Sequence, residues 1–191
     1  IFSILCFLEF YSLIKKIFNK KIYFIISVFL ISVYLIFFNF FLVNIRINFG
    51  VEIILILLLA CIFSDMGGYI FGKLIGGPKL SRISPKKTIS GAFGSIIFTV
   101  IGTSLCSLYL VKIDENSIVF ELSIKFYIWL VMMSLISQIG DLFFSYLKRK
   151  AKIKDTGNIL PGHGGILDRI DGILLGIPIG LLYVLILVFT G

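Results

Sequence analysis

Long runs of apolar residues, separated by short polar segments, account for most of the chain. An apolar stretch at residues 1–14 is followed by five fuller runs, which are 22–43, 51–71, 91–111, 126–147 and 172–190. One helix needs about 20 apolar residues to cross the bilayer core, which is about 30 Å thick. The runs do not alternate in polarity as barrel strands do, and backbone groups in lipid must be paired within a helix. The pattern predicts an all-α fold, a polytopic helical membrane protein with about five full transmembrane helices and a truncated N-terminal one.

The first apolar stretch begins without Met and without the basic segment that opens a signal peptide. We therefore expect it to be the end of a crossing whose start is missing from the sequence. On this interpretation residues 1–191 form a single integral-membrane domain that is incomplete at its N-terminus.

The polar connections between the runs alternate in charge. Three of them, 15–21, 72–90 and 148–171, are strongly basic, whereas 44–50 holds one Arg and 112–125 holds three acids against two Lys. Short basic loops stay on the cytoplasmic side of a membrane. The rule places the three basic loops in the cytoplasm, so the net charge of +8 indicates orientation rather than binding to nucleic acid.

The overall composition excludes several classes of protein. Apolar residues make up 59% of the chain and charged residues 15%, against roughly 45–50% and about 25% in soluble domains. These values exclude a disordered chain, a collagen-like chain and a nucleic-acid-binding domain, and they argue against a water-soluble globule. The three cysteines lie inside apolar runs without C-x-x-C spacing, so the sequence shows no sign of a disulfide framework or a zinc site.

Two acidic residues lie within apolar surroundings near the cytoplasmic ends of their runs. Asp65 and Asp141 are flanked by apolar residues, and a charge at membrane depth is costly unless it faces water or a partner. We expect them to line a polar site, or alternatively to pair with a Lys or Arg that holds helices together. Glu9 and Glu52 lie near the ends of apolar stretches, from which they could reach the membrane interface.

A second acidic group lies in the sequence LDRIDGI. Asp168 and Asp171 are three residues apart, so on a helix they share one face and repel each other. A divalent cation such as Mg²⁺ would offset that repulsion, because it prefers oxygen ligands. The alternative is a solvated helix start, where acids are favoured. All four aspartates fall on one expected side of the membrane, which favours a shared site.

Two glycine-rich basic loops have a composition typical of phosphate binding. Residues 72–91 combine glycines with lysines and with hydroxyls of Ser84, Thr88 and Ser90, although a Walker A pattern is absent. A basic loop that rests on anionic lipid head groups is the alternative. Residues 145–171 hold the only His of the chain, His163, followed by a glycine pair that a ligand could approach closely.

Residues 145–171 also carry a specific motif. It begins with Ser145 and Leu147-Lys148-Arg149, continues with Lys154-Asp155, Gly157 and Leu160-Pro161, and ends in His163-Gly164-Gly165-Ile166, Asp168-Arg169 and Ile170-Asp171. This segment resembles the signature of the phosphatidate cytidylyltransferases, also called CDP-diglyceride synthases. The other basic loop is similar to the same family at Asp65, Tyr69, Gly72, Ser84, Pro85, Lys87 and Thr88. Ser90 departs from the pattern, since many members have Glu there.

The resemblance implies a reaction and a set of site residues. The reaction is CTP plus phosphatidate giving CDP-diacylglycerol plus pyrophosphate, with Mg²⁺ and a second, monovalent cation such as K⁺. The implied catalytic residues are Asp141, Lys148, Arg149, Asp168, Arg169 and Asp171, of which the three aspartates would bind the metal. The implied substrate-binding residues are Ser84, Lys86, Lys87, Thr88, Ser145, Lys154, His163, Gly164 and Gly165. Asp65 could order its loop or join the metal site, and Tyr69 and His163 would support the site from outside.

The expected partners are CTP, phosphatidate and membrane lipid, with no nucleic acid and with a homodimer left open. The expected location is a bacterial inner membrane, with the site facing the cytoplasm. One alternative is an ion-coupled transporter that uses Asp65 and Asp141, but such sites lie near the midplane between repeats. A second is a scaffold or inactive paralogue that keeps the signature. A CDP-alcohol phosphotransferase would need an A-R step and a spacing that this sequence lacks.

Overall fold

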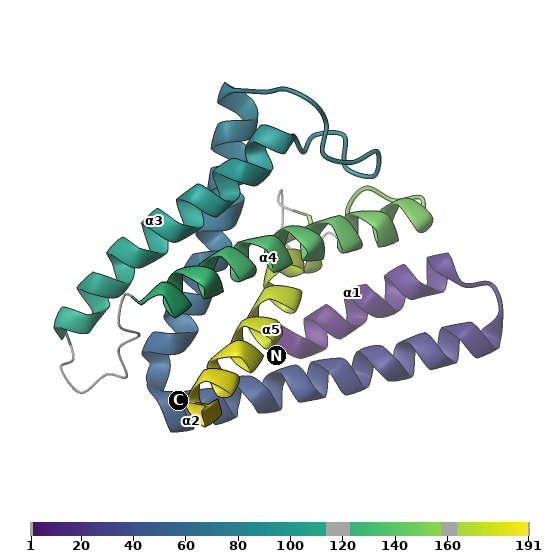
Figure 1. The fold of residues 1–191 in the computed structure, drawn as a ribbon. Coiled ribbons are helices and arrows are strands. Elements are labelled where there is room, and N and C mark those ends of the chain that lie inside the picture. Colours follow the sequence, from purple (N-terminus) through teal and green to yellow (C-terminus); the bar gives the residue numbers. More distant parts are fainter. Residues whose placement is uncertain (1, 114–122, 158–163, 191) are drawn as a thin grey trace.

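The structure, a computed structural model, describes residues 2–113, 123–157 and 164–190. Five α-helices make up this part of the chain (Figure 1). They are α1 (Phe2–Ile17), α2 (Lys21–Leu74), α3 (Ile89–Ile113), α4 (Ile124–Lys150) and α5 (Leu167–Thr190). The described ranges contain no β-strand, and an isolated bridge joins Lys79 and Thr88. The expected all-α fold is confirmed.

Helix α2 contains both of the apolar runs expected at 22–43 and 51–71. The prediction of a loop at 44–50 was wrong, because helical backbone continues as far as Gly50. Asn44 and Asn48 remain in the helix by donating their side-chain amides one turn back, to the carbonyl oxygens of Phe40 (2.7 Å) and Asn44 (2.8 Å). Only Gly50 leaves the helix, with φ 83° and ψ 179°, a conformation that glycine adopts without steric cost.

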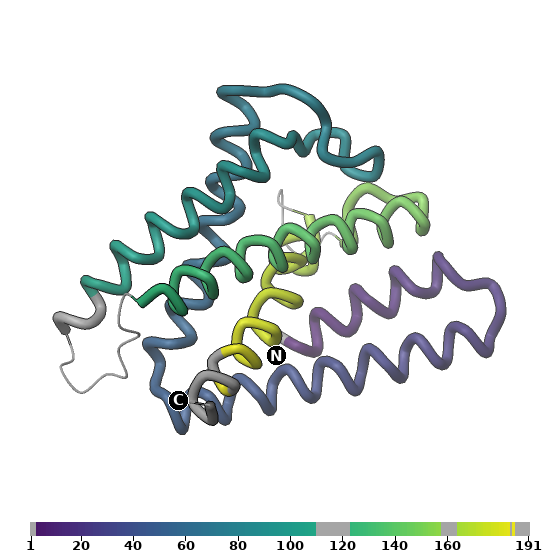
Figure 2. The backbone as a smooth tube through the Cα atoms, in the orientation of Figure 1, coloured from purple at the N-terminus to yellow at the C-terminus, as the bar shows by residue number. Residues whose placement is uncertain are grey.

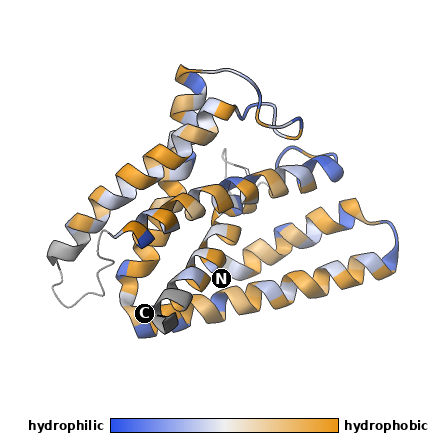
Figure 3. Cartoon of the chain, in the orientation of Figure 1, coloured by the Kyte–Doolittle hydropathy of each residue, from blue (hydrophilic) through white to orange (hydrophobic). Residues whose placement is uncertain are grey.

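Three of the described helices are long and apolar enough to cross a membrane: α2, residues 89–109 of α3, and α4. Gly50 divides the 54 residues of α2 into two parts about 44 Å and about 36 Å long, each longer than the hydrocarbon core is thick. Figure 3 shows hydrophobic residues along the length of the helices. Many large apolar side chains are exposed, among them Phe29, Phe40 and Leu105 at 65%, 64% and 63%. Such a surface fits lipid as the surrounding solvent, while the number of crossings stays a prediction.

The helices pack through small residues and a buried tryptophan. A Cβ atom on Gly67 of α2 would lie only 2.4 Å from the carbonyl oxygen of Gly94 in α3, so these helices approach at backbone distance. Trp129 of α4 is buried and donates its indole N–H to the carbonyl oxygen of Gly180 in α5 at 2.9 Å. These contacts fix α3, α4 and α5 around the second half of α2.

The three basic segments lie toward one end of the molecule. In Figure 1 the turn between α1 and α2, segment 75–88 and the C-terminal end of α4 lie to the right and top of the view. The bend at Gly50 and the C-terminal end of α5 lie at lower left, and the tube of Figure 2 follows the same course. Figure 3 shows hydrophilic residues at these basic segments and also near the bend of α2 and the start of α4. The three basic segments of the sequence therefore extend toward the same end of the helical bundle.

Candidate functional site

Two glycines allow α4 and α5 to approach closely near the basic end. A Cβ atom on Gly140 would lie 2.8 Å from the carbonyl oxygen of Asp171, and one on Gly172 would lie 2.4 Å from Oγ of Ser137. Larger residues at either position would force the helices apart. Because Asp141 follows Gly140 and Asp171 precedes Gly172, the close approach brings the two carboxylates together.

Asp168 lies in the first turn of α5, ahead of the expected span 172–190, and organises the loop before it. Its Oδ2 accepts hydrogen bonds from the backbone N–H of Thr156 (2.8 Å), from Thr156 Oγ1 (3.1 Å) and from the backbone N–H of Gly165 (3.1 Å). Burial raises the pKa of Asp168, but the hydrogen bonds from Lys148, Thr156 and Gly165 outweigh burial and hold it below its usual value. Asp168 is therefore a carboxylate whose charge the protein itself stabilises.

The pair formed by Asp141 and Asp171 has fewer donors and lies between two lysines. Lys87 donates to Asp141 from the segment between α2 and α3. Lys148 Nζ lies 2.8 Å from Oδ1 of Asp168 and 3.9 Å from Oδ2 of Asp171. Burial, and then the charge of Asp141, raises the pKa of Asp171 to about 8. The second negative charge of this pair is thus unfavourable unless a further cation is present.

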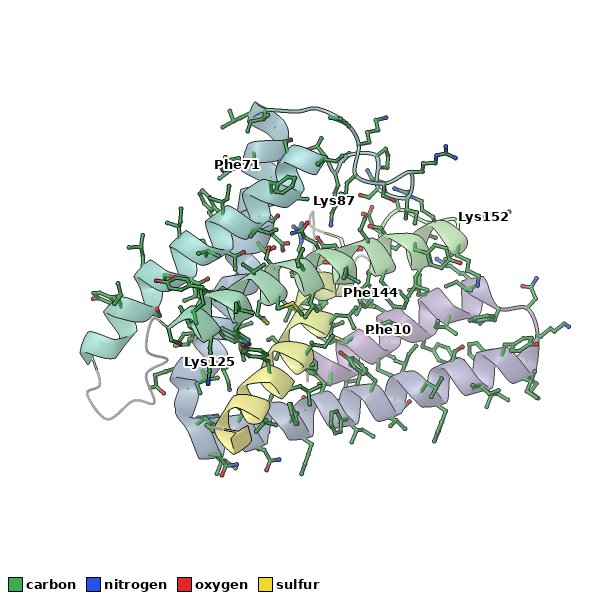
Figure 4. All side chains as sticks on the ribbon, viewed as in Figure 1. Phe10, Phe71, Lys87, Lys125, Phe144 and Lys152 are labelled. Atoms are coloured by element: carbon green, nitrogen blue, oxygen red, sulfur yellow. The ribbon has the colours of Figure 1, made fainter. Side chains whose placement is uncertain are left out.

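A cavity of about 260 Å³ opens beside Asp141, between α2, α3, α4 and segment 75–88. Residues of segment 75–88 line the cavity together with the carboxylates of Asp65 and Asp141. The lining includes Asp65, Tyr69, Lys86, Lys87, Thr88 and Asp141. Figure 4 shows Lys87 in the space between segment 75–88 and α4. Ammonium and hydroxyl donors around one cavity suit a phosphate group.

Thr88 and Ser90 fix the end of segment 75–88 against α3. Thr88 Oγ1 accepts a hydrogen bond from the backbone N–H of Gly91 (3.1 Å), as the cap of the helix, and lies 3.0 Å from Ser90 Oγ. Ser90 Oγ donates to the carbonyl oxygen of Gly76. The serine at the position where the resemblance leads one to expect Glu therefore joins the two ends of the segment.

The other expected site residues differ in their placement. Lys86, Arg149, Lys154 and Arg169 are exposed, Ser84 and Ser145 are half-buried, and Gly165 is buried. Gly164 has φ 83°, a conformation that favours glycine. His163 lies outside the described residues.

A metal ion at this site would need carboxylate ligands among the described residues. Within residues 2–113, 123–157 and 164–190, no three His, Cys, Asp or Glu side chains converge closely enough to hold a metal ion. Mg²⁺ usually takes only one or two carboxylates and completes its shell with water and substrate phosphates. The pair of Asp141 and Asp171 fits that requirement, whereas the expected set of three with Asp168 stays a prediction.

Glu9, which the sequence analysis left outside the site, joins this region. The residue is only 3% exposed and faces other parts of the protein. Its carboxylate accepts hydrogen bonds from the backbone N–H groups of Ile166 and Leu167. Its Oε2 also lies 3.0 Å from Thr156 Oγ1, whose single hydrogen Glu9 and Asp168 share. The available signal was its spacing, since Glu9 shares a helical face with Cys6 and Leu13, both fully buried.

Comparisons with known proteins give a consistent result. The sequence profile of the Cytidylyltransferase family matches residues 1–187. A phosphatidate cytidylyltransferase of Rickettsia bellii is 44% identical over 130 residues, which are 65% of this chain and 55% of the relative. Proteins of the same name from Helicobacter pylori and Staphylococcus epidermidis are each 40% identical, over 138 residues (72% and 48%) and 136 residues (68% and 48%). The chain spans about half the length of the curated relatives it matches.

Proposed function

Because the chain belongs to the cytidylyltransferase family, we propose that it transfers the cytidylyl group of CTP to phosphatidate, giving CDP-diacylglycerol and pyrophosphate. The name of its relatives, phosphatidate cytidylyltransferase, supports this choice of substrates. The observation that carries the proposal is the half-buried pair of Asp141 and Asp171 between Lys87 and Lys148, toward the basic end of an apolar helical bundle.

The proposed chemistry is a nucleotidyl transfer. A phosphate oxygen of phosphatidate attacks the α-phosphorus of CTP, the bond from that phosphorus to the bridging β-phosphate oxygen breaks, and pyrophosphate leaves. A phosphomonoester has its second pKa near 6, so the attacking group is already largely dianionic at about pH 7. A strong general base is therefore unnecessary, and the task of the site is to bring two polyanions together.

Asp141 and Asp171 are the proposed Mg²⁺ ligands. Mg²⁺ bound there would offset negative charge on the phosphates of both substrates. It would also compete with Lys87 and Lys148 for these carboxylates, which would free the two ammonium groups for phosphate oxygens. Asp168 is a further proposed ligand through Oδ1, because Oδ2 is held by the loop before α5. A second, monovalent cation such as K⁺ is proposed on the resemblance alone.

The remaining basic residues are proposed to bind phosphate from two sides. Lys86, Lys87 and Thr88 would contact phosphate in the cavity beside Asp141. Four basic residues of α4, α5 and the loop between them would neutralise the triphosphate and the leaving pyrophosphate, namely Lys148, Arg149, Lys154 and Arg169. The other proposed substrate-binding residues of this region are Ser145, His163, Gly164 and Gly165. Asp65, which also lines the cavity, is proposed to order the loop that carries Lys86, Lys87 and Thr88.

The proposed setting is a bacterial inner membrane with the site facing the cytoplasm. Exposed apolar side chains on the helices support lipid contact, and the basic segments at one end support the orientation. Phosphatidate could keep its acyl chains in the bilayer while CTP arrives from the cytoplasm. Five full crossings and one partial crossing, and a homodimer, belong to this proposal.

The test supplies the purified chain in detergent with phosphatidate, Mg²⁺ and CTP radiolabelled at either the α- or the γ-phosphorus. The proposal predicts α label in the lipid fraction and γ label in released pyrophosphate, with no lipid label when diacylglycerol replaces phosphatidate. Label from γ-labelled CTP in lipid would indicate a kinase. No lipid label from either CTP would favour the scaffold or transporter alternatives.

A further inference from the structure

Glu9 is a carboxylate on the buried, otherwise apolar face of α1. Cys6 and Leu13, one turn before and after it, are fully buried. The neighbouring Phe10 packs on Phe144 of α4 with ring centroids 5.5 Å apart, as Figure 4 shows for these two labelled residues. α1 is therefore held against the helix that carries Asp141, and Glu9 points into the protein.

The carboxylate of Glu9 binds the start of α5. Oε1 accepts the backbone N–H of Ile166 at 3.0 Å, and Oε2 accepts the backbone N–H of Leu167 at 2.9 Å. Helix N-termini leave such groups unpaired and favour a negative charge beside them. Glu9 thus supplies, from a helix more than 150 positions earlier in the sequence, the anion that this helix start requires.

Glu9 also connects to Asp168 through Thr156. Thr156 Oγ1 lies 3.0 Å from Glu9 Oε2 and 3.1 Å from Asp168 Oδ2, and the Thr156 backbone N–H donates to the same Asp168 oxygen at 2.8 Å. The space for Glu9 depends on two glycines of the motif. A Cβ atom on Gly165 would lie 2.6 Å from Glu9 Oε2, and one on Gly157 would lie 2.7 Å from Oε1.

We propose that Glu9 is a positioning residue for the cytidylyl-transfer site. It fixes Thr156 and the first turn of α5, and through them the direction of Asp168 and the distance of Asp171 from Lys148. The inference rests on the proposed function, because it assumes that these residues carry the transfer. A consequence is that Ile166 and Leu167 N–H groups are taken by a protein carboxylate, so the start of α5 is closed to substrate phosphate.

The experiment compares Glu9→Gln with Glu52→Gln, the same change in α2 far from this network. Gln keeps the size of Glu but turns an amide N–H toward backbone N–H donors, so at least one of the hydrogen bonds is lost. We expect the kcat of Glu9→Gln to fall about 10- to 100-fold, the size of one lost charged hydrogen bond. The KM for CTP should change less than about threefold, because the substrate contacts remain.

A second readout does not depend on activity. Amide hydrogen exchange at Ile166 and Leu167 should become at least tenfold faster in Glu9→Gln, while exchange in α3 and the melting midpoint stay as in the parent. Thr156→Val removes the hydroxyl that links Glu9 to Asp168 and should lower kcat similarly, whereas Thr156→Ser should keep it. The double variant of Glu9→Gln and Thr156→Val should lose little more than either single variant.

The outcomes separate the inference from the proposed function. Parent activity in Glu9→Gln, or unchanged exchange at Ile166 and Leu167, would overturn the positioning role. Additive losses in the double variant would also overturn it, because Glu9 would then act independently of Thr156. If Glu9→Gln fails to fold, Thr156→Val against Thr156→Ser decides the same question. An inactive parent chain would instead refute the proposed function, while the exchange data would still report on Glu9.

Discussion

The aspartates at the basic end of the bundle differ in their contacts. Asp168 accepts hydrogen bonds from Thr156 and Gly165 and forms an ion pair with Lys148, so its negative charge is stabilised within the protein. Asp171 lies against Asp141, and burial together with that neighbour raises the pKa of Asp171 to about 8. A cation would stabilise this pair more than it would stabilise Asp168, because only the pair has an unbalanced charge.

The first prediction concerns Asp171→Asn. We expect turnover to fall about 10³-fold, since the metal site would lose several kcal/mol of stabilisation for the transition state. The melting midpoint in detergent should not fall, because the substitution keeps the side-chain volume and removes the repulsion with Asp141. Glu52→Gln is the control for a lost carboxylate elsewhere. Turnover near that of the parent would exclude Asp171 from the metal site.

The second prediction concerns Lys87→Met. Lys87 lines the cavity and pairs with Asp141, so its loss should lower kcat/KM for CTP about 10²-fold, as for one lost donor to a charged transition state. The Mg²⁺ concentration for half-maximal rate should decrease, because a competitor for Asp141 is gone. Lys125→Met is the matched control, on an exposed position at the opposite end of α4 (Figure 4). A higher Mg²⁺ requirement in Lys87→Met would contradict the account.

At the scale of the helices, the site depends on the contact between α4 and α5. A Cβ atom at position 140 would meet the backbone of α5 rather than a movable side chain, at 2.8 Å from the Asp171 carbonyl oxygen and 3.2 Å from the Cα of Gly172. Neither helix can relieve this contact by a rotamer change. The distance between Asp141 and Asp171 is therefore set by two glycines that carry no chemistry of their own.

The third prediction is that Gly140→Ala lowers both stability and turnover. Overpacking costs about 1–3 kcal/mol, whereas replacing Gly with Ala inside a helix stabilises the helix by about 1 kcal/mol. A net loss of stability would therefore show that the added Cβ atom meets α5. We expect a lower melting midpoint and at least tenfold slower transfer. Ile139→Ala is the control, since Ile139 is 58% exposed. A more stable, fully active Gly140→Ala would show that the close approach is unimportant.

The sequence was sufficient for the all-α fold class, because the thickness of a bilayer sets the length of an apolar run. It predicted Asp168 and Asp171 on one helix, and α5 contains both. It did not predict that the helix would continue through residues 44–49, since hydropathy does not register the amide-to-carbonyl bonds of Asn44 and Asn48. The burial of Glu9 was also missed, because its partners lie far away in the sequence.

The site itself was predicted as a set of residues and not as an arrangement. The family resemblance grouped the three aspartates together, yet their separate environments follow from Thr156, Gly165 and the glycines at the helix contact. A local signal for such close approaches was present, because Gly172, Gly176 and Gly180 of α5 are spaced four residues apart, as in helices that pack closely in membranes. The spacing does not say which helix the glycines meet. The loop cap by Thr88 is the exception, since a hydroxyl before a helical run is a common helix start.

At the scale of the whole molecule, the basic segments and the candidate site occupy the same end of the bundle (Figure 1). Helix α4 has 27 residues and is about 40 Å long, enough to cross the hydrocarbon core. Its two ends should therefore lie on opposite sides of the membrane. The apolar outer surface would contact lipid along the length between them.

The fourth prediction uses Lys152→Cys and Lys125→Cys in a background with the three native cysteines replaced by Ser or Ala (Figure 4). A membrane-impermeant maleimide should label Lys152→Cys only from the cytoplasmic side and Lys125→Cys only from the other side. In intact cells the reagent reaches only the outer side of the membrane, and in inverted vesicles it reaches only the cytoplasmic side. Labelling in detergent gives the total amount of reactive cysteine. Labelling of both cysteines from one side would contradict a crossing by α4.

The central claim is a metal-dependent cytidylyl transfer at the pair of Asp141 and Asp171. The most direct measurement is the rate at which α label passes from CTP to phosphatidate while Mg²⁺ is removed with EDTA and then restored. The account predicts a steady rate that EDTA abolishes and excess Mg²⁺ recovers in the parent chain, with no recovery in Asp171→Asn. An EDTA-resistant rate, or equal recovery in Asp171→Asn, would contradict it.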